Sequence, residues 1–141
     1  MEANKMNEIM LIDDDRATNY LSQYVIDELG CCENLSIHDM AQDALDDIQS
    51  RIDTQSPLPD VIFLDLNMPR INGWEFLEIY EKFDLSSCDS RPSIYVLSTT
   101  MNPKDRIRAE SVESVVKFYA KPLTERIIVE TMADREENSS K

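Results

Sequence analysis

The sequence predicts an α/β fold built on a doubly wound, parallel, five-stranded sheet. Short apolar runs alternate with segments in which apolar residues recur every three or four positions, a pattern typical of βαβ units. The apolar runs 9–12, 61–64 and 94–97 lack regular polar alternation, as expected of central strands covered by helices on both faces. Four runs also end in polar residues, and the carboxyl ends of parallel strands meet at one edge of a sheet.

The first half of the chain predicts two strands and two helices. A helix follows strand 9–12 and can end at Gly30. Its predicted buried face consists of Ala17, Leu21, Tyr24, Val25 and Leu29. Residues 35–37 alternate as an edge strand does, and Asp39 is placed to cap a second helix. The predicted buried face of that helix consists of Ala41, Ala44, Leu45, Ile48 and Ile52.

The second half continues the alternation. A helix over 73–83 follows strand 61–64, and the polar connection 84–92 leads to strand 94–97. Asn102-Pro103 predicts the start of a fourth helix, and Thr124 can cap a fifth after strand 118–120. Right-handed crossovers give the strand order 2-1-3-4-5, which is the flavodoxin-like arrangement, with its switch point between strands 1 and 3.

Composition limits the classes of protein that the chain can represent. Its 141 residues suit one domain, which we place at 1–133, followed by a flexible polar tail at 134–141. The net charge of −14 argues against nucleic acid or an anionic membrane as a partner. No apolar stretch has the length of a membrane span or a signal peptide core, so a cytoplasmic protein is expected. Cys31, Cys32 and Cys88 suit reduced thiols.

The polar residues at the strand ends point to phosphoryl chemistry. Asp13-Asp14, Asp65, Ser98 and Lys121 follow the first, third, fourth and fifth strands. Two carboxylates about 4 Å apart repel by roughly 4 kcal/mol at an effective dielectric near 20, so the cluster needs a cation. Oxygen ligands favour Mg²⁺ or Mn²⁺. Asp65 is then the expected nucleophile, with Lys121 and Ser98 stabilising charge on the phosphoryl oxygens.

This set of residues resembles the receiver domain of two-component response regulators, whose simplest form is the single-domain chemotaxis regulator. The resemblance spans roughly residues 7 to 132 and is carried by the following motifs. They are Asp13-Asp14, Asp65-Leu66-Asn67-Met68-Pro69 with Gly73, Ser98, and Lys121-Pro122.

The resemblance implies a phosphoacceptor signalling domain rather than an ordinary enzyme. Asp65 would accept a phosphoryl group from a histidine kinase or phosphotransfer protein, and the domain would promote its own Mg²⁺-dependent phosphotransfer and dephosphorylation. Asp14, Asp65 and the Asn67 carbonyl would hold the metal, which Asp13 would join mainly through water. Ser98 and Lys121 would contact the phosphoryl oxygens.

The resemblance also assigns a switch and residues that tune the phosphoryl lifetime. Ser98 and Phe118 occupy the switch positions, and Phe118, which lacks a tyrosine hydroxyl, is expected to favour its inward position even without phosphate. Asn67, Thr99 and Thr100 occupy tuning positions without a carboxylate, which predicts slow to intermediate self-dephosphorylation. Ser114 and Lys117 stand where the family often has glycine, so the usual signal for the end of the fourth helix is missing.

The resemblance further implies an output surface formed by the fourth helix, the fifth strand and the fifth helix. It would carry five basic residues, Lys104, Arg106, Arg108, Lys117 and Arg126. These suit an acidic downstream partner, although a solvated face is the simpler interpretation. The protein would be a monomer or a phosphorylation-dependent dimer.

Each motif has a simpler interpretation by itself, and other classes of protein remain open. Asp13-Asp14-Asp15 alone suits a turn and helix cap, and His38 suits a surface residue. A flavodoxin-like electron carrier would need neutral donors around a flavin phosphate. A phosphatase of the haloacid dehalogenase kind would need an acid where Asn67 stands. A degenerate receiver, acting as a phosphorylation-independent interaction module, is a further alternative.

Overall fold

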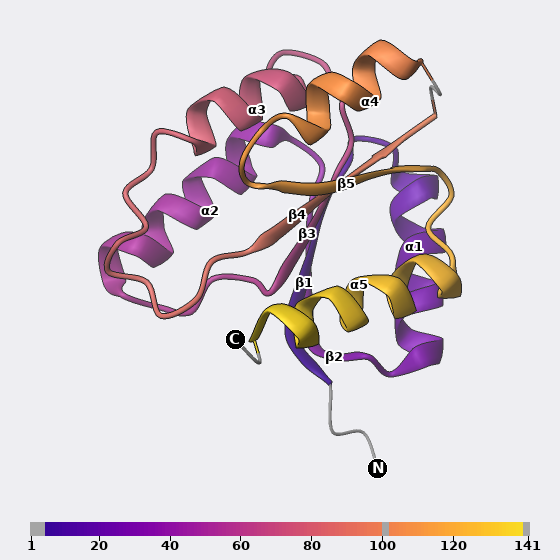
Figure 1. Ribbon diagram of the computed structural model, residues 1–141, viewed down its shortest axis with the longest axis horizontal. Coiled ribbons are helices and arrows are strands. Elements are labelled where there is room, and N and C mark those ends of the chain that lie inside the picture. The colour runs from indigo at the N-terminus through magenta and orange to yellow at the C-terminus, as the bar shows by residue number, and fades with distance from the viewer. Residues whose placement is uncertain (1–4, 100–101, 140–141) are drawn as a thin grey trace.

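Five parallel strands form the centre of the molecule (Figure 1). The computed structural model describes residues 5–99 and 102–139, with side chains as far as residue 135. The strands are β1 (Met6–Ile12), β2 (Cys32–His38), β3 (Val61–Leu64), β4 (Ser93–Ser98) and β5 (Val115–Ala120). Their order is β2-β1-β3-β4-β5 and every neighbouring pair is parallel, which confirms the predicted fold.

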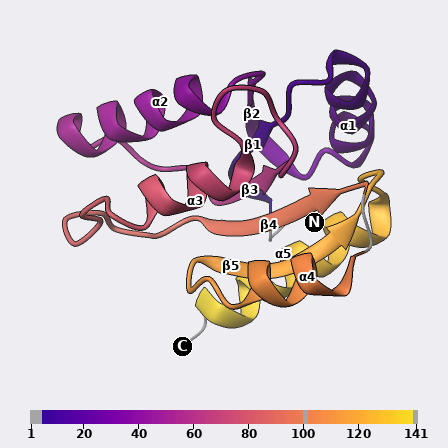
Figure 2. The ribbon, with the colours of Figure 1, turned by 90° about the horizontal axis from the view of Figure 1, so that it is seen from above.

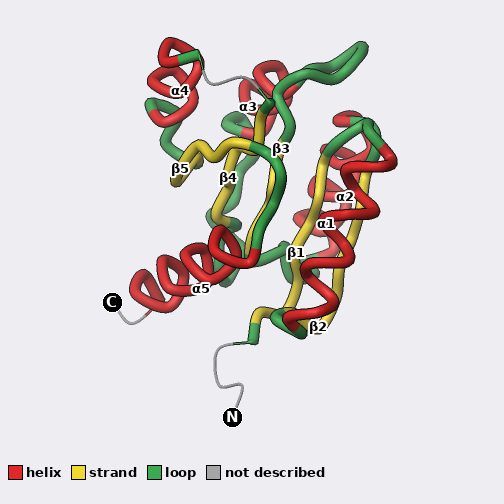
Figure 3. The backbone as a smooth tube through the Cα atoms, turned by 90° about the vertical axis from the view of Figure 1, so that its right-hand side faces the viewer, coloured by secondary structure: helices red, strands yellow, loops and turns green. Residues whose placement is uncertain are grey.

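Helices cover both faces of this sheet. They are α1 (Arg16–Leu29), α2 (Ala41–Thr54), α3 (Gly73–Tyr80), α4 (Pro103–Glu110) and α5 (Glu125–Ser139). One face packs against α1 and α5, and the other against α2, α3 and α4 (Figures 1 and 2). Every residue of β3 and β4 is buried, as the absence of polar alternation in their sequences predicted. Figure 3 shows the strands from the side, enclosed by the helices.

The buried face of α1 agrees with the prediction only in part. Val25 and Leu29 pack against the core as predicted. Ala17 is exposed, as are Leu21 and Tyr24, with 59% and 60% of their surface accessible. The buried residues of α1 are Asn19, Ser22 and Ile26. The helix carries apolar residues on both sides, so its periodicity alone did not distinguish the two faces. Asn19 can occupy the core side because its side-chain amide donates to the Asp13 carbonyl at the end of β1.

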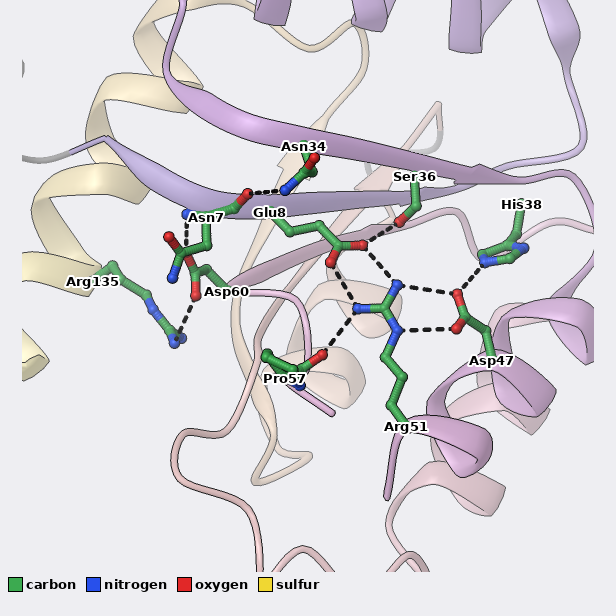
Figure 4. A network of polar contacts seen from close by, with 10 residues as sticks. All are labelled: Asn7, Glu8, Asn34, Ser36, His38, Asp47, Arg51, Pro57, Asp60 and Arg135. Carbon is green, nitrogen blue, oxygen red and sulfur yellow. Dashed lines mark hydrogen bonds and ion pairs between the residues drawn. The ribbon is translucent and has the colours of Figure 1, made fainter. Parts of the chain in front are cut away.

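A half-buried polar network attaches α2 to the edge of the sheet (Figure 4). The guanidinium of Arg51 donates to Glu8 of β1, at 2.7 and 2.9 Å, and to Asp47 one turn earlier in α2. Asp47 also contacts His38 of β2 at 2.9 Å, so His38 has a structural partner. The predicted cap Asp39 does not cap α2, because the N-cap position falls at Met40, which makes no side-chain capping bond.

The other predicted helix starts are confirmed. The Asn102 side chain accepts from the Lys104 N–H at the start of α4, with Pro103 following it, and the Thr124 hydroxyl accepts from the Ile127 N–H in α5. α4 ends without a left-handed residue, since Ser111 keeps right-handed helical angles, so no glycine is needed there.

The last helix continues beyond residue 133, where the sequence predicted that the domain ends. Arg135 donates to the Ser90 and Ser93 hydroxyls, at 2.7 and 3.0 Å, and lies 3.6 Å from Asp60 (Figure 4). Polar contacts therefore extend α5 where its sequence lacks apolar residues. No helix in the described part of the chain is long and apolar enough to cross a membrane.

Candidate functional site

Three carboxylates meet at the carboxyl edge of the two central strands. Asp13 and Asp14 follow β1 and Asp65 follows β3, and these strands pair up to Ile12 and Leu64. One oxygen from each carboxylate lies within 4.8 Å of the other two. Asp13 and Asp65 retain 6% and 5% of their accessible surface, whereas Asp14 is exposed. The predicted cluster therefore has two buried members and one that faces solvent.

Among the described residues, Lys121 is the cationic side chain that forms ion pairs with these carboxylates. It follows β5, and its Nζ lies 2.5 Å from Asp13 Oδ2 and 3.5 Å from Asp65 Oδ1. Burial would lower the pKa of Lys121, but its hydrogen bond to Asp13 and the two negative charges outweigh this and raise it. Burial, followed by the charge of Asp13, raises the pKa of Asp65, although Lys121 acts in the opposite direction.

Local hydrogen bonds position the end of β1. The buried side-chain amide of Asn19 donates to the backbone carbonyl of Asp13 at 2.8 Å, and the Asp15 N–H donates to Asp13 Oδ1 at 2.9 Å. Asp15 in turn caps α1 through the Ala17 N–H. The sequence reasoning missed Asn19. A polar residue one turn into the helix is a usable signal only when the core face of α1 is known.

The end of β3 is fixed by the close approach of α3. The Gly73 N–H donates to the Leu66 carbonyl at 3.0 Å, and a Cβ at position 73 would lie 2.6 Å from the Asp65 carbonyl oxygen. Only glycine fits this contact. Asn72 and Glu75 form a capping box at the start of α3. Asn67 is exposed, and its N–H donates to Asp65 Oδ1 at 3.3 Å.

The remaining predicted residues occupy the β4 and β5 side of the site. Ser98 is fully buried at the end of β4, and its carbonyl accepts from the Lys121 N–H at 2.9 Å. The Phe118 side chain is inward, with 5% of its surface exposed, in the core layer shared with α4. Thr99 is exposed, and Thr100 lies outside the described residues.

The donor set fits a hard divalent cation. Its side-chain ligands are carboxylate oxygens, which select Mg²⁺ or Mn²⁺ over softer metals. Three carboxylates and Lys121 carry a net charge of −2, which a divalent ion balances. Mg²⁺ usually keeps several waters, and the exposed Asp14 leaves one side of the cluster open to them.

The fold and the site together define a class of protein. A flavodoxin-like sheet with an acidic cluster and a lysine at its carboxyl edge is the arrangement expected of a receiver domain. The family model described as "Response regulator receiver domain" matches residues 9–133, and the chain belongs to this family. It is therefore the receiver domain of a two-component response regulator.

Solved structures agree with this assignment. The chain is similar to a two-component response regulator from Cytophaga hutchinsonii, with 25% identity, a TM-score of 0.86 and coverage of 94% of this chain and 98% of that one. A response regulator receiver protein from Dyadobacter fermentans is 26% identical, with a TM-score of 0.79 and coverage of 92% of this chain and 97% of that one. The Mn²⁺-bound form of response regulator Rcp1 is 28% identical, with a TM-score of 0.67 and coverage of 92% of this chain and 91% of that one. A search of curated proteins gives no match.

Proposed function

We propose that this receiver domain is a phosphorylation-dependent switch and that Asp65 is its phosphoacceptor. A carboxylate oxygen of Asp65 would attack the phosphorus of a phosphohistidine on a histidine kinase or phosphotransfer protein. The P–N bond would break, the imidazole would leave, and an aspartyl phosphate would form. The observation that carries this proposal is a buried Asp65 carboxylate beside Lys121, whose ammonium contacts both Asp65 and Asp13.

The surrounding residues have distinct proposed roles. Asp13, Asp14, Asp65 and the Asn67 carbonyl would hold Mg²⁺ or Mn²⁺, which neutralises charge on the phosphoryl oxygens when bound. The Lys121 ammonium would stabilise a further phosphoryl oxygen, because it already lies 3.5 Å from Asp65. The existence of an Mn²⁺-bound form of Rcp1, a protein of similar fold, supports binding of a divalent ion by this chain.

The hydroxyl of Ser98 and the ring of Phe118 would form the switch. Ser98 is joined to Lys121 through the backbone, so a phosphoryl group that draws in one of them acts on both. The burial of the Phe118 ring, which keeps 5% of its surface exposed, supports the expectation that this ring favours the core.

The phosphoryl lifetime would be slow to intermediate. Asn67 and Thr99 are exposed beside the site, and neither carries a carboxylate that could activate a water molecule. Their exposure supports a role in controlling access of water to the aspartyl phosphate. The proposed contribution of Thr100 concerns a residue outside the described part of the chain.

The surface next to the site supports a protein as the phosphodonor. Tyr20, Leu21 and Tyr24 expose 72%, 59% and 60% of their surface on α1, which starts directly after the acidic cluster. Exposed apolar groups in a contiguous stripe mark interaction sites more often than isolated ones do. A docking protein could cover this stripe while presenting its phosphohistidine to Asp65.

The basic residues expected on α4, β5 and α5 are largely engaged in contacts within the chain. Four of the five have intramolecular partners. Arg106 lies 3.7 Å from Glu110, Lys117 and Arg126 lie 3.8 and 2.8 Å from Glu130, and Arg108 stacks on Trp74. The same elements expose Ile107, Val116 and Val129. We therefore favour apolar contact with a downstream protein, or with a second copy after phosphorylation, over recognition of an acidic partner.

The direct test is incubation with acetyl phosphate and Mg²⁺, followed by intact-mass measurement. The wild-type protein should gain the mass of one phosphoryl group, and Asp65→Asn should gain none. Asp53→Asn, which removes an exposed carboxylate from α2, should behave as the wild type. The absence of a mass gain in the wild type would favour a degenerate receiver that binds partners without phosphorylation. A gain that persists in Asp65→Asn would exclude Asp65 as the acceptor.

A further inference from the structure

The fourth helix has little apolar attachment to the rest of the domain. α4 spans eight residues and buries only Ala109, whereas α2 and α3 each bury four residues. Its single aliphatic residue besides Ala109 and the initial proline is Ile107, which exposes 71% of its surface. Helices with few buried apolar contacts have low local stability. Polar contacts must therefore contribute much of what fixes the position of α4.

Two such contacts come from the last turn of α4. The Arg108 guanidinium lies over the Trp74 ring of α3, 4.0 Å from the ring centroid. Glu110 Oε2 accepts the backbone N–H of Phe118 at 3.0 Å. Glu110 also pairs with Arg106 at 3.7 Å within the helix.

The bond to Phe118 is unusual in where it lies. β5 is the last strand in the sheet order, so the N–H groups on its outer side have no neighbouring strand to accept them. The Glu110 carboxylate takes the place of a strand at one of these groups. A hydrogen bond to an ionised acceptor is stronger than a neutral one, and the Glu110 side chain keeps 33% of its surface exposed.

The two partners of this bond lie on the two segments that connect to Ser98 and Lys121 of the site. Glu110 belongs to the helix that follows Ser98, and Phe118 belongs to the strand that leads to Lys121. In the sheet, Phe118 pairs with Val96, and Ala120 pairs with Ser98. A displacement of Ser98 or Lys121 toward a group on Asp65 would therefore alter the distance between Glu110 and the Phe118 amide.

We propose that Glu110 is a positioning residue that holds α4 against β5 in the unphosphorylated domain and so opposes its activation. This inference rests on the proposed phosphorylation of Asp65. A contact shifts an equilibrium only when it differs between the two states. We assign the bond between the Glu110 carboxylate and the Phe118 N–H to the unphosphorylated domain, and activation lengthens or breaks this bond. Loss of the carboxylate then favours the activated state.

The test compares three variants in a titration with beryllofluoride, a phosphoryl mimic, in Mg²⁺ buffer, followed by fluorescence of Trp74. Glu110→Ala should bind at least about fivefold more tightly than the wild type, the lower range of typical coupling between sites. Glu110→Gln keeps an oxygen that can accept the Phe118 N–H, so its affinity should lie between those two. Arg106→Gln removes the ion pair and leaves the Phe118 bond, so its affinity should equal that of the wild type.

Two further measurements separate positioning from simple stabilisation. Urea unfolding gives the loss of stability for each variant, and amide hydrogen exchange of Phe118 in metal-free protein should be faster in Glu110→Ala. A variant that loses stability but keeps wild-type beryllofluoride affinity would overturn the inference, as would unchanged exchange at Phe118. A wild-type protein that does not bind beryllofluoride, or an Asp65→Asn variant that binds it equally well, would instead overturn the proposed function and this inference together.

Discussion

Replacing Gly73 with alanine tests how closely the start of α3 is fitted to the strand end that carries Asp65. The new Cβ would lie 2.6 Å from the Asp65 carbonyl oxygen, 2.6 Å from the Leu66 Cα and 2.9 Å from the Leu66 Cδ2. Non-bonded carbon atoms prefer separations of about 3.5–4.0 Å. The helix or the strand end must therefore move by about 1 Å. Two of the contacts are with backbone atoms, so a change of side-chain rotamer cannot relieve them.

The expected cost is about 1–3 kcal/mol of unfolding free energy, the usual range for overpacking a well-filled site. The movement also displaces Asp65 relative to Asp13 and loosens the bond from the Gly73 N–H to the Leu66 carbonyl. We expect Mg²⁺ affinity to fall by roughly 10- to 100-fold, as is typical when groups that orient metal ligands are disturbed. Urea unfolding followed by far-ultraviolet circular dichroism, and Mg²⁺ titration calorimetry, measure the two effects.

Gly30→Ala is the matched control, because Gly30 is the other glycine of the chain. Its φ of +57° is left-handed, so alanine there costs about 1–2 kcal/mol although no atom lies within 4 Å of the new Cβ. Gly30 ends α1 at the far end from the acidic cluster, so Mg²⁺ affinity should not change. The reasoning fails if Gly73→Ala retains wild-type stability and affinity, or if Gly30→Ala weakens Mg²⁺ binding equally.

Three more predictions concern charge and surface. The pKa of Asp65 is raised in the folded protein, so the wild type loses stability relative to Asp65→Asn as pH rises through that pKa. Without metal, Asp65→Asn should therefore gain stability relative to the wild type between about pH 4 and neutrality. Addition of Mg²⁺ should reduce this gain. Arg51→Met should lose about 3–5 kcal/mol in urea unfolding, because half-buried Glu8 and Asp47 lose their shared partner. Leu21→Ser should slow phosphotransfer from a phosphorylated protein donor but not from acetyl phosphate.

Each of these predictions has a result that would contradict it. A wild-type protein that keeps its stability relative to Asp65→Asn across that pH range would show that burial of the carboxylate has no net cost. A loss below about 1 kcal/mol in Arg51→Met would mean that the network behaves as exposed ion pairs do. Equal slowing of both transfer reactions by Leu21→Ser would indicate damage to the site and not to a docking surface.

The strand order and the convergence of the site residues followed from the sequence because uninterrupted apolar runs mark the central strands and polar residues follow them directly. The buried apolar runs 61–64 of β3 and 94–97 of β4 are uninterrupted and lead directly into Asp65 and Ser98, so the positions of these two residues at the sheet edge followed from the runs. The register of parallel neighbours then places Asp13 beside Asp65 without further information.

The complete buried face of α1 and the ion pairs of the output surface could not be predicted from the sequence. α1 carries apolar residues on two faces, so its periodicity predicted the face containing Leu21, which is exposed. The intramolecular partners of the basic residues on the expected output surface did not follow from the sequence either. Glu130 lies near Lys117, Arg126 and the Tyr119 hydroxyl at the same time, and such pairing across α5 and β5 depends on distances that a linear sequence does not contain.

The two sides of the site are held by different kinds of contact, and this difference suggests how a signal would travel. On the β1 and β3 side, Asn19 fixes the Asp13 backbone, and Gly73 packs directly on the Asp65 backbone. On the other side, α4 buries one residue and depends on polar contacts such as that of Glu110. Packed backbone contacts yield little, so a new group on Asp65 would be accommodated mainly by movement of the weakly held side. We therefore expect α4 and β5, rather than β1 and β3, to move when Asp65 is phosphorylated.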